Sequence, residues 1–139
     1  MITNQILLNT IEGLKGISRV DFCIFDTEEK VLASTFEDSQ MFEGSVRSFV
    51  ESQAESQVIQ GYQFFKIFDE QQLEYILLVE GDSENSYMIG KMAAFQIQNL
   101  LVAYKERFDK DNFIKNLLLD NLLLVDIYNR AKNYILTQK

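Results

Sequence analysis

The chain has 139 residues, of which 47% are hydrophobic and 24% charged, a composition typical of one folded domain and unlike that of a disordered chain. Its net charge is −8, and an acidic surface repels phosphate, so this chain alone is a poor candidate for binding nucleic acid or an anionic membrane surface. It has no histidine, which excludes zinc sites and histidine-based acid–base catalysis within the chain. We expect no cofactor and no metal.

The single cysteine, Cys23, lies in the apolar stretch "VDFCIFD". No intrachain disulfide can form, which fits a reducing cytoplasm, and we expect a small core residue because a redox role needs exposure and a nearby cation. The N-terminal stretch "MITNQILLNTIEGLKG" has neither the basic nor the continuous apolar region of a signal peptide. No apolar window is long enough to cross a membrane. These features together predict a cytoplasmic protein.

The first half of the chain predicts a helix, a hairpin and a second helix. Residues 3–15 have helical apolar spacing, with Thr3 or Asn4 as the cap and Gly13 or Gly16 near the end. Residues 19–26 and 31–36 predict two strands joined by the acidic turn 26–30. Residues 37–53 predict a short helix, because apolar side chains recur at helical spacing at Met41, Phe42, Val46, Phe49 and Val50.

The second half predicts strands followed by long helices. Residues 56–69 are strand-like, with a bend at Gly61, and segments 62–68 and 73–80 form a hairpin around a polar turn. A helix is expected over 82–108, and Asp109 or Asp111 caps a further helix that continues to about residue 136. Antiparallel hairpins with helices on one face and at the ends indicate an α+β domain. We expect a sensing domain over 1–108 and a dimerisation helix over 109–139.

The candidate ligand-binding residues lie on predicted strands and at the start of the 82–108 helix. A small ligand is expected between the sheet and the 37–53 helix. Hydroxyls at a strand end could hold it at the sheet edge, although Asp26 and Thr27 nearby are also ordinary turn formers. The full candidate set is Ser34, Thr35, Phe64, Lys66, Tyr75, Tyr87 and Lys91.

Two lysines in that set have alternative interpretations. Strand alternation puts Lys66 on one face with Tyr62, Phe64 and Phe68, where it either binds a carboxylate ligand or is an edge lysine whose stem covers the rings. Residues 83–91 either bind an anion at the helix N-terminus, with Lys91 one to two turns further on, or represent ordinary capping with close packing at Gly90. Paired carboxylates such as "DTEE" lie in predicted turns and indicate a solvated surface.

The strongest pattern is "FIKNLLLDNLLLVDIYNRA", residues 113–131. Alternating steps of three and four residues predict a helical seam, and further leucines make it broader than a simple two-stranded contact. A core-only role is possible, but such an apolar helix favours a second copy as partner. Asn121 at an a-type position would fix register. The seam consists of Ile114, Leu117, Asn121, Leu124 and Tyr128.

Three stretches carry a resemblance to a known family: "VDFCIFDTEEKVLAST", "ESQVIQGYQFFKIFDEQQLEYILLVEG" and, most diagnostic, "YMIGKMAAFQIQNLLVAYKERFDKDNFIKNLLLDNLLLVDIYNRAK". The chain resembles the N-terminal sensory region of bacterial transcription regulators of the PucR/CdaR type, the sugar-diacid-regulator-like group. The resemblance covers nearly the whole chain. It implies a PAS/GAF-like sensor joined by helices to a DNA-binding module, and regulation of transcription by a small molecule such as a sugar acid or related carboxylate. The chain ends at Lys139 without that module, so we expect an isolated sensor domain.

Three functional hypotheses follow. The first is a ligand-sensing, homodimerising domain of a transcription regulator, which contacts DNA only through the missing module. The second is a structural dimerisation module without a ligand. The third, an enzyme, is disfavoured because no nucleophile is paired with a base in the sequence.

Overall fold

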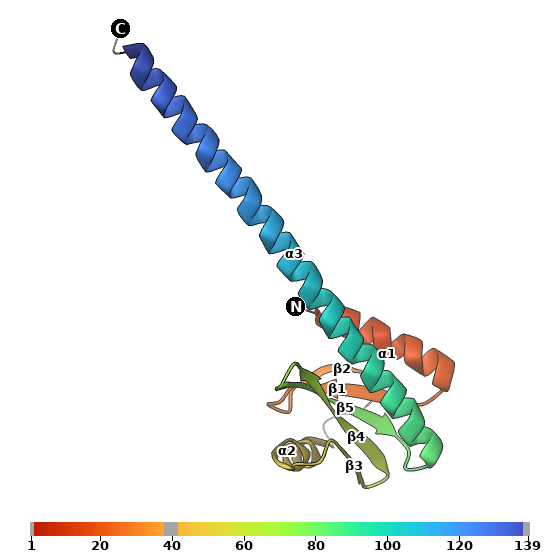
Figure 1. Ribbon diagram of the computed structural model, residues 1–139. Helices are drawn as coiled ribbons and strands as arrows, with labels where there is room; N and C mark the ends of the chain where they lie inside the picture. Colours follow the sequence, from red (N-terminus) through yellow and green to blue (C-terminus); the bar gives the residue numbers. More distant parts are fainter. Residues whose placement is uncertain (1, 38–41, 138–139) are drawn as a thin grey trace. The chain divides into compact units, whose positions relative to one another are not determined.

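A computed structural model describes residues 2–37 and 42–137. One five-stranded antiparallel sheet has the order β2-β1-β5-β4-β3, and helices flank it (Figure 1). The expected α+β class is confirmed, as is the long C-terminal helix. The elements in chain order are α1 (Asn4–Ser18), β1 (Phe22–Phe25), β2 (Val31–Ser34), α2 (Glu43–Glu51), β3 (Ser56–Ile59), β4 (Tyr62–Asp69), β5 (Gln72–Glu80) and α3 (Glu84–Thr137).

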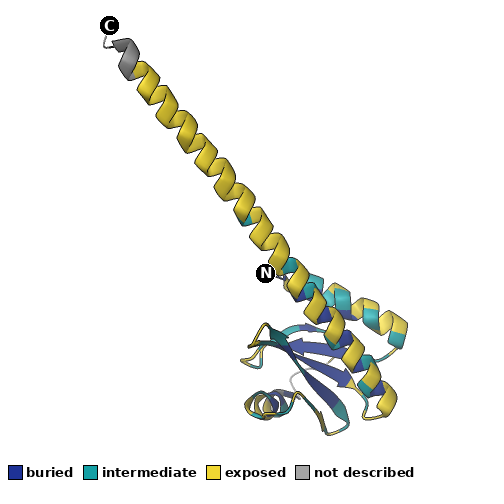
Figure 2. Ribbon diagram, in the orientation of Figure 1, coloured by how far each residue is buried: buried dark blue, intermediate teal, exposed yellow. Residues whose placement is uncertain are grey.

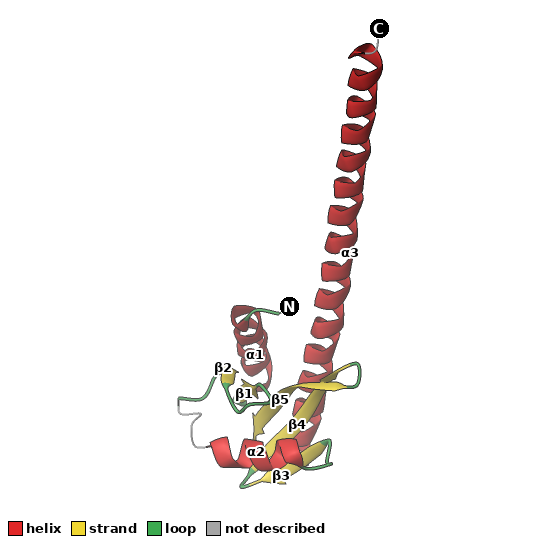
Figure 3. Cartoon of the chain, turned by 90° about the vertical axis from the view of Figure 1, so that its left-hand side faces the viewer, coloured by secondary structure: helices red, strands yellow, loops and turns green. Residues whose placement is uncertain are grey.

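Helices cover both faces of the sheet, not one face as the sequence suggested. α2 lies on one face, and α1 with the first part of α3 lies on the other (Figure 3). The central strands therefore bury both sets of alternating side chains: all of β1 is buried, as are residues 75–79 of β5. This explains why their sequences are continuous apolar runs.

Tight turns connect the strands as the turn chemistry requires. The predicted strand 56–69 is two strands, because Gln60 and Gly61 both have positive φ (53° and 84°) and form a two-residue hairpin turn between Ile59 and Tyr62. Between β1 and β2, the Asp26 carboxylate accepts hydrogen bonds from the backbone of Glu28 (2.9 Å) and Lys30 (2.8 Å). Asp26 is therefore a turn former, as its alternative interpretation held.

The ends of two helices differ from the prediction. Thr3 caps α1 by accepting a hydrogen bond from the Ile6 amide (3.3 Å). α1 then continues through Gly13 and Gly16 to Ser18 and stops where Arg19 adopts a left-handed conformation (φ 63°). The 37–53 helix is shorter, Glu43–Glu51, and Met41 lies outside the described residues. Asp109 and Asp111 start no new helix, since α3 is continuous from Glu84 to Thr137.

The chain divides into two compact units within α3, Met1–Ala103 and Tyr104–Lys139, a division earlier than the expected boundary at 108/109. In the first unit, Ala93, Ile97 and Leu101 of α3 are buried. In the second, residues 105–111 and 113–133 are all exposed (Figure 2). Within the described residues, no helix has the length and apolar character needed to cross a membrane.

Candidate functional site

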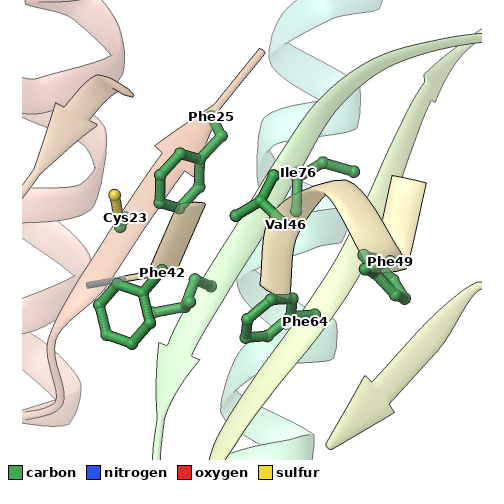
Figure 4. Close-up of a cluster of buried hydrophobic side chains, with 8 residues drawn as sticks. Cys23, Phe25, Phe42, Val46, Phe49, Phe64 and Ile76 are labelled. Atoms are coloured by element: carbon green, nitrogen blue, oxygen red, sulfur yellow. The ribbon is translucent and has the colours of Figure 1, made fainter. Parts of the chain in front are cut away.

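The space between the sheet and α2, where a ligand was expected, contains a packed hydrophobic cluster (Figure 4). Phe49 and Phe64 meet edge-to-face with ring centroids 5.7 Å apart, and both are fully buried. At the cluster margin Phe36, Phe42 and Tyr62 form a second group of edge-to-face rings, with centroids 4.7–6.0 Å apart. The buried members are Cys23, Phe25, Phe42, Val46, Phe49, Phe64, Ile76 and Leu78.

Lys66 lies at the edge of this cluster and is satisfied within the chain. Its ammonium donates a hydrogen bond to the Ser52 carbonyl after α2 and lies 5.1 Å from the centroid of the Phe49 ring. A carbonyl dipole and an aromatic face both stabilise a half-buried cation. This geometry matches the interpretation of Lys66 as an edge lysine that covers aromatic rings.

The structure separates the other predicted ligand residues onto two faces of the sheet. Phe64 belongs to the α2-side cluster with Ile76 and Leu78. Tyr75 is the neighbour of Ile76 in β5, so strand alternation turns it to the opposite face. Ser34 pairs with Cys23 across β1 and β2 and therefore faces α2. These residues do not form one site.

Thr35 belongs to a polar cluster that fastens α1 to the sheet. Its hydroxyl accepts from the Phe22 amide (2.9 Å) and donates to the Asp21 carboxylate (2.9 Å). Lys15 of α1 makes an ion pair of 2.7 Å with the same Asp21 oxygen. Desolvation raises the pKa of Asp21, but the hydrogen bonds from Lys15 and Thr35, with the charge of Lys15 and a contact from Glu80, hold this pKa below its ordinary value. Thr35 therefore has a structural partner.

The start of α3 is capped by a serine that precedes it and packs against β4. The Ser83 hydroxyl accepts from the Ser86 amide (3.1 Å), and the buried Gln63 amide donates to the Ser83 carbonyl (3.3 Å). A Cβ on Gly90 would overlap the Phe65 ring of β4. The alternative of ordinary capping with close packing at Gly90 therefore describes this segment.

Two predicted ligand residues line one groove, which lies between β4 and α3. The β4–α3 groove, as we call it, has a volume of about 430 Å³ and lies where β3 begins, against the early turns of α3. Lys91 is exposed there, and Lys66 also lines the groove although its ammonium is directed to Ser52. Tyr87 packs against Phe65, which lines the groove, and their ring centroids are 5.7 Å apart. The lining residues are Glu55, Ser56, Phe65, Lys66, Phe68, Lys91, Ala94, Phe95 and Gln98.

This groove combines aromatic walls with one exposed ammonium. Phe65, Phe68 and Phe95 offer apolar contact area, and Lys91 offers a hydrogen-bond donor of positive charge. Ser56 and Gln98 add neutral polar groups, while Glu55 adds a negative charge at the start of β3. The chemistry suits a small, partly apolar molecule with a carboxylate.

Burial raises the pKa values of two titratable groups in the interior. Burial raises the pKa of Cys23 to about 12, so its thiol is protonated at neutral pH and is a poor nucleophile. Burial, aided by the charges of Glu74 and Asp69, also raises the pKa of Tyr75. Within the described ranges, no three Cys, Asp or Glu side chains are grouped to hold a metal ion.

The predicted seam residues are all exposed in the second unit. Leu117, Leu124 and Tyr128 are 50%, 63% and 67% exposed, and Ile114 is 43% exposed; Asn121 is exposed as well. Their neighbours Leu118, Leu122 and Val125 are exposed too. In the described part of the second unit, this segment has no apolar partner.

The sequence interpretation missed a second apolar surface, on the first unit. Met88, Met92 and Phe95 were expected as helix positions, but they point away from the sheet and are 56%, 67% and 68% exposed. Their steps of four and three residues were the available signal. Met92 borders an α1–α3 groove of about 490 Å³, whose lining residues are Asn9, Thr10, Gly13, Leu14, Ile17, Met92 and Gln96.

No family model matches this chain, and no curated protein matches it.

Proposed function

We propose that this chain is a homodimerising, effector-sensing domain of a bacterial transcription regulator. The observation that carries the proposal is the exposed apolar segment 113–128 of α3, which bears leucines on almost every side. A helix that is hydrophobic all round is normally buried. Self-association is the means of burial that the segment itself suggests, because it has heptad-like spacing with Asn121 at an a-type position, where paired amides favour two strands in one register.

The effector part of the proposal rests on the β4–α3 groove. The ligand class is a small carboxylate whose anion meets Lys91 and whose body contacts Phe65, Phe68 and Phe95. α3 contributes Lys91, Ala94, Phe95 and Gln98 to this groove and also contains the leucine seam. A ligand that prefers one arrangement of α3 would therefore change how two copies pair. The link to transcription is supported by the family resemblance of the sequence.

A second candidate, a dimerisation module without an effector, is favoured by one observation. The space between the sheet and α2 is packed with the aromatic cluster around Phe49 and Phe64, as expected of a domain whose sheet only supports α3. The two candidates share the dimer and differ in the groove.

The dimer is tested by light scattering on the full chain at tens of micromolar. We expect the mass of two chains, and the double variant Leu117→Glu/Leu124→Glu to be monomeric, because each carboxylate would lie in an apolar seam. The matched control is Lys115→Glu, an acidic substitution at a polar, exposed position of the same segment. A monomeric parent chain would exclude the proposed function.

The effector is tested by thermal denaturation with sugar acids and dicarboxylates at high concentration. A carboxylate that binds the folded state raises the free energy of unfolding, by roughly 2.7 kcal/mol at a ligand concentration of a hundred times Kd. The melting temperature should rise as a result. Lys91→Gln should remove most of the shift, whereas Lys30→Gln, on the β1–β2 turn, should leave it. No shift with any compound would leave the dimerisation module as the better description.

A further inference from the structure

The side of α3 that faces away from the sheet carries exposed apolar side chains in the first unit. Met88, Met92, Phe95 and Val102 are 48–68% exposed, and Ile17 of the adjacent α1 is 84% exposed. Steps of four, three and seven residues keep the four α3 residues on one side of the helix. We call these five residues the outer apolar face.

The outer apolar face forms a ridge between two grooves. Met92 borders the α1–α3 groove, of about 490 Å³, and Phe95 borders the β4–α3 groove, of about 430 Å³. Helices pack by inserting ridges into grooves. A surface that presents a ridge beside a groove can complement itself across a twofold axis, which is the geometry of most homodimers.

The area needed for a stable dimer also points to a second copy. Full burial of a large apolar side chain removes roughly 60–120 Å² of surface, so the five residues of the outer apolar face bury roughly 300–600 Å² per chain. A stable, specific interface buries ~800 Å² per partner. The outer apolar face is therefore too small to hold a partner of its own, and it fits an addition to a contact that the second copy already makes.

We propose that the outer apolar face packs against the same face of a second copy, as an interface additional to the leucine seam. This inference rests on the proposed homodimer and extends it to the sensing unit. Phe95 would then belong both to the interface and to the wall of the β4–α3 groove. A molecule in that groove and the second copy would share a side chain, which gives effector binding a direct route to dimer affinity.

Cysteine crosslinking tests whether the two faces meet. In the full-length variant Met92→Cys, oxidised glutathione should convert most chains to disulfide-linked dimers. The native Cys23 is fully buried and should not compete. Glu28→Cys, exposed on the β1–β2 turn, is the matched control. Crosslinking of Met92→Cys no faster than of Glu28→Cys would overturn the inference.

Sedimentation equilibrium separates this inference from the proposed function. Met92→Glu/Phe95→Glu should raise the dimer Kd at least tenfold while circular dichroism stays unchanged, because both side chains are exposed in the single chain. Gln57→Glu, exposed on β3, should leave the Kd unchanged. If the parent chain is a dimer that Leu117→Glu/Leu124→Glu dissociates, but Met92→Glu/Phe95→Glu leaves its Kd unaltered, the proposed function stands and the second interface is wrong.

Discussion

The two faces of the sheet use their apolar residues in opposite ways. On the α2 side, a short helix closes over Phe25, Phe64 and their neighbours, and the whole cluster is buried within the chain. On the other side, α1 and α3 bury only their inner residues, such as Leu7, Ile11 and Ile97, and present apolar side chains outward. Apolar content alone therefore does not distinguish a core from a binding surface; burial of each helix side does.

The contrast also separates stability from association. Residues on the α2 side are buried in each single chain, so their loss should lower the free energy of unfolding. Residues of the outer apolar face and the leucine seam are exposed in the single chain, so their loss should affect pairing. Each prediction below changes one side and measures whether this separation holds.

The largest effect on folding is expected from Phe64→Ala. Phe64 is fully buried against Phe49, and truncation of a buried phenylalanine costs about 3–5 kcal/mol through lost burial and the cavity that remains. Urea denaturation of the full chain should show this loss as a lower midpoint with a similar slope.

The comparison for Phe64→Ala is Leu124→Ala, which removes an exposed apolar side chain (63% exposed). In the Leu117→Glu background, at a concentration where light scattering gives the mass of one chain, it should change the unfolding free energy by less than about 0.5 kcal/mol. A loss of several kcal/mol there would mean that the seam is packed within its own chain, against the contrast drawn here.

The sequence predicted the fold where local signals agreed with tertiary packing. The apolar runs at 19–26 and 73–81 became β1 and β5 because a central strand buries both faces. The predicted end of α1 was wrong because Gly13 and Gly16 are tolerated inside a helix. The helix ends instead where Arg19 adopts a left-handed conformation. The polar residues at 109–112 are each less favourable in a helix than alanine by less than about 1 kcal/mol, so they do not interrupt α3.

The ligand residues were harder to predict because they depend on register. Phe64 pairs with Leu78, and both side chains face α2. Tyr75 lies three residues before Leu78 in β5, so strand alternation places its side chain on the opposite face. The hydrogen bond from Lys66 to the Ser52 carbonyl joins residues that are distant in sequence, and no local pattern signals it. Met92 is exposed because the opposite side of α3 meets the sheet. The sequence has two apolar stripes along this helix, and spacing alone does not tell which stripe is buried.

On the α3 side, Gly90→Ala should have the next largest effect. The added Cβ would overlap the Phe65 ring, which is itself almost fully buried and cannot move freely. Overpacking of this kind costs about 1–3 kcal/mol. Thermal denaturation should show a lower melting temperature. The matched control is Gly16→Ala in α1, where a Cβ has no neighbour within 4 Å, and it should stabilise by up to about 1 kcal/mol. Equal effects of the two variants would contradict close packing of α3 on β4.

Lys66→Met examines how the α2 side ends at its edge. Methionine keeps the apolar stem but leaves the Ser52 carbonyl without its donor and removes the cation beside Phe49. A loss of about 1 kcal/mol in unfolding free energy is expected from urea denaturation. Lys30→Met, on an exposed turn, should be neutral. If Lys66→Met is more stable than the parent chain, burial of the ammonium costs more free energy than its hydrogen bond to Ser52 and its contact with Phe49 contribute.

The smallest expected effect concerns the attachment of α1 to the sheet through Asp21. Its pKa in the folded chain lies below the ordinary value of 3.8, so its stabilising contribution is present above that value and is lost as the pH falls through the lowered folded pKa. The hydrogen bond from Lys15 to Asp21 raises the pKa of Lys15 above its ordinary value of 10.5, so this contribution is lost only as the pH rises through the raised pKa. The ion pair should therefore be complete from about pH 5 to pH 10.

Asp21→Asn removes that charge while keeping an acceptor for the Thr35 hydroxyl. The melting temperature at pH 7 should fall by about 1–3 °C, because Lys15 and Asp21 are both partly exposed (46% and 26%) and water screens their attraction. As the pH falls below 3.8, the difference between the parent chain and the variant should shrink, because the contribution of the carboxylate is lost as the pH falls through its lowered folded pKa. High salt should also reduce the difference at pH 7. A difference that does not shrink as the pH falls would show that the charge of Asp21 does not cause the effect, and α1 would then be held to the sheet by neutral contacts.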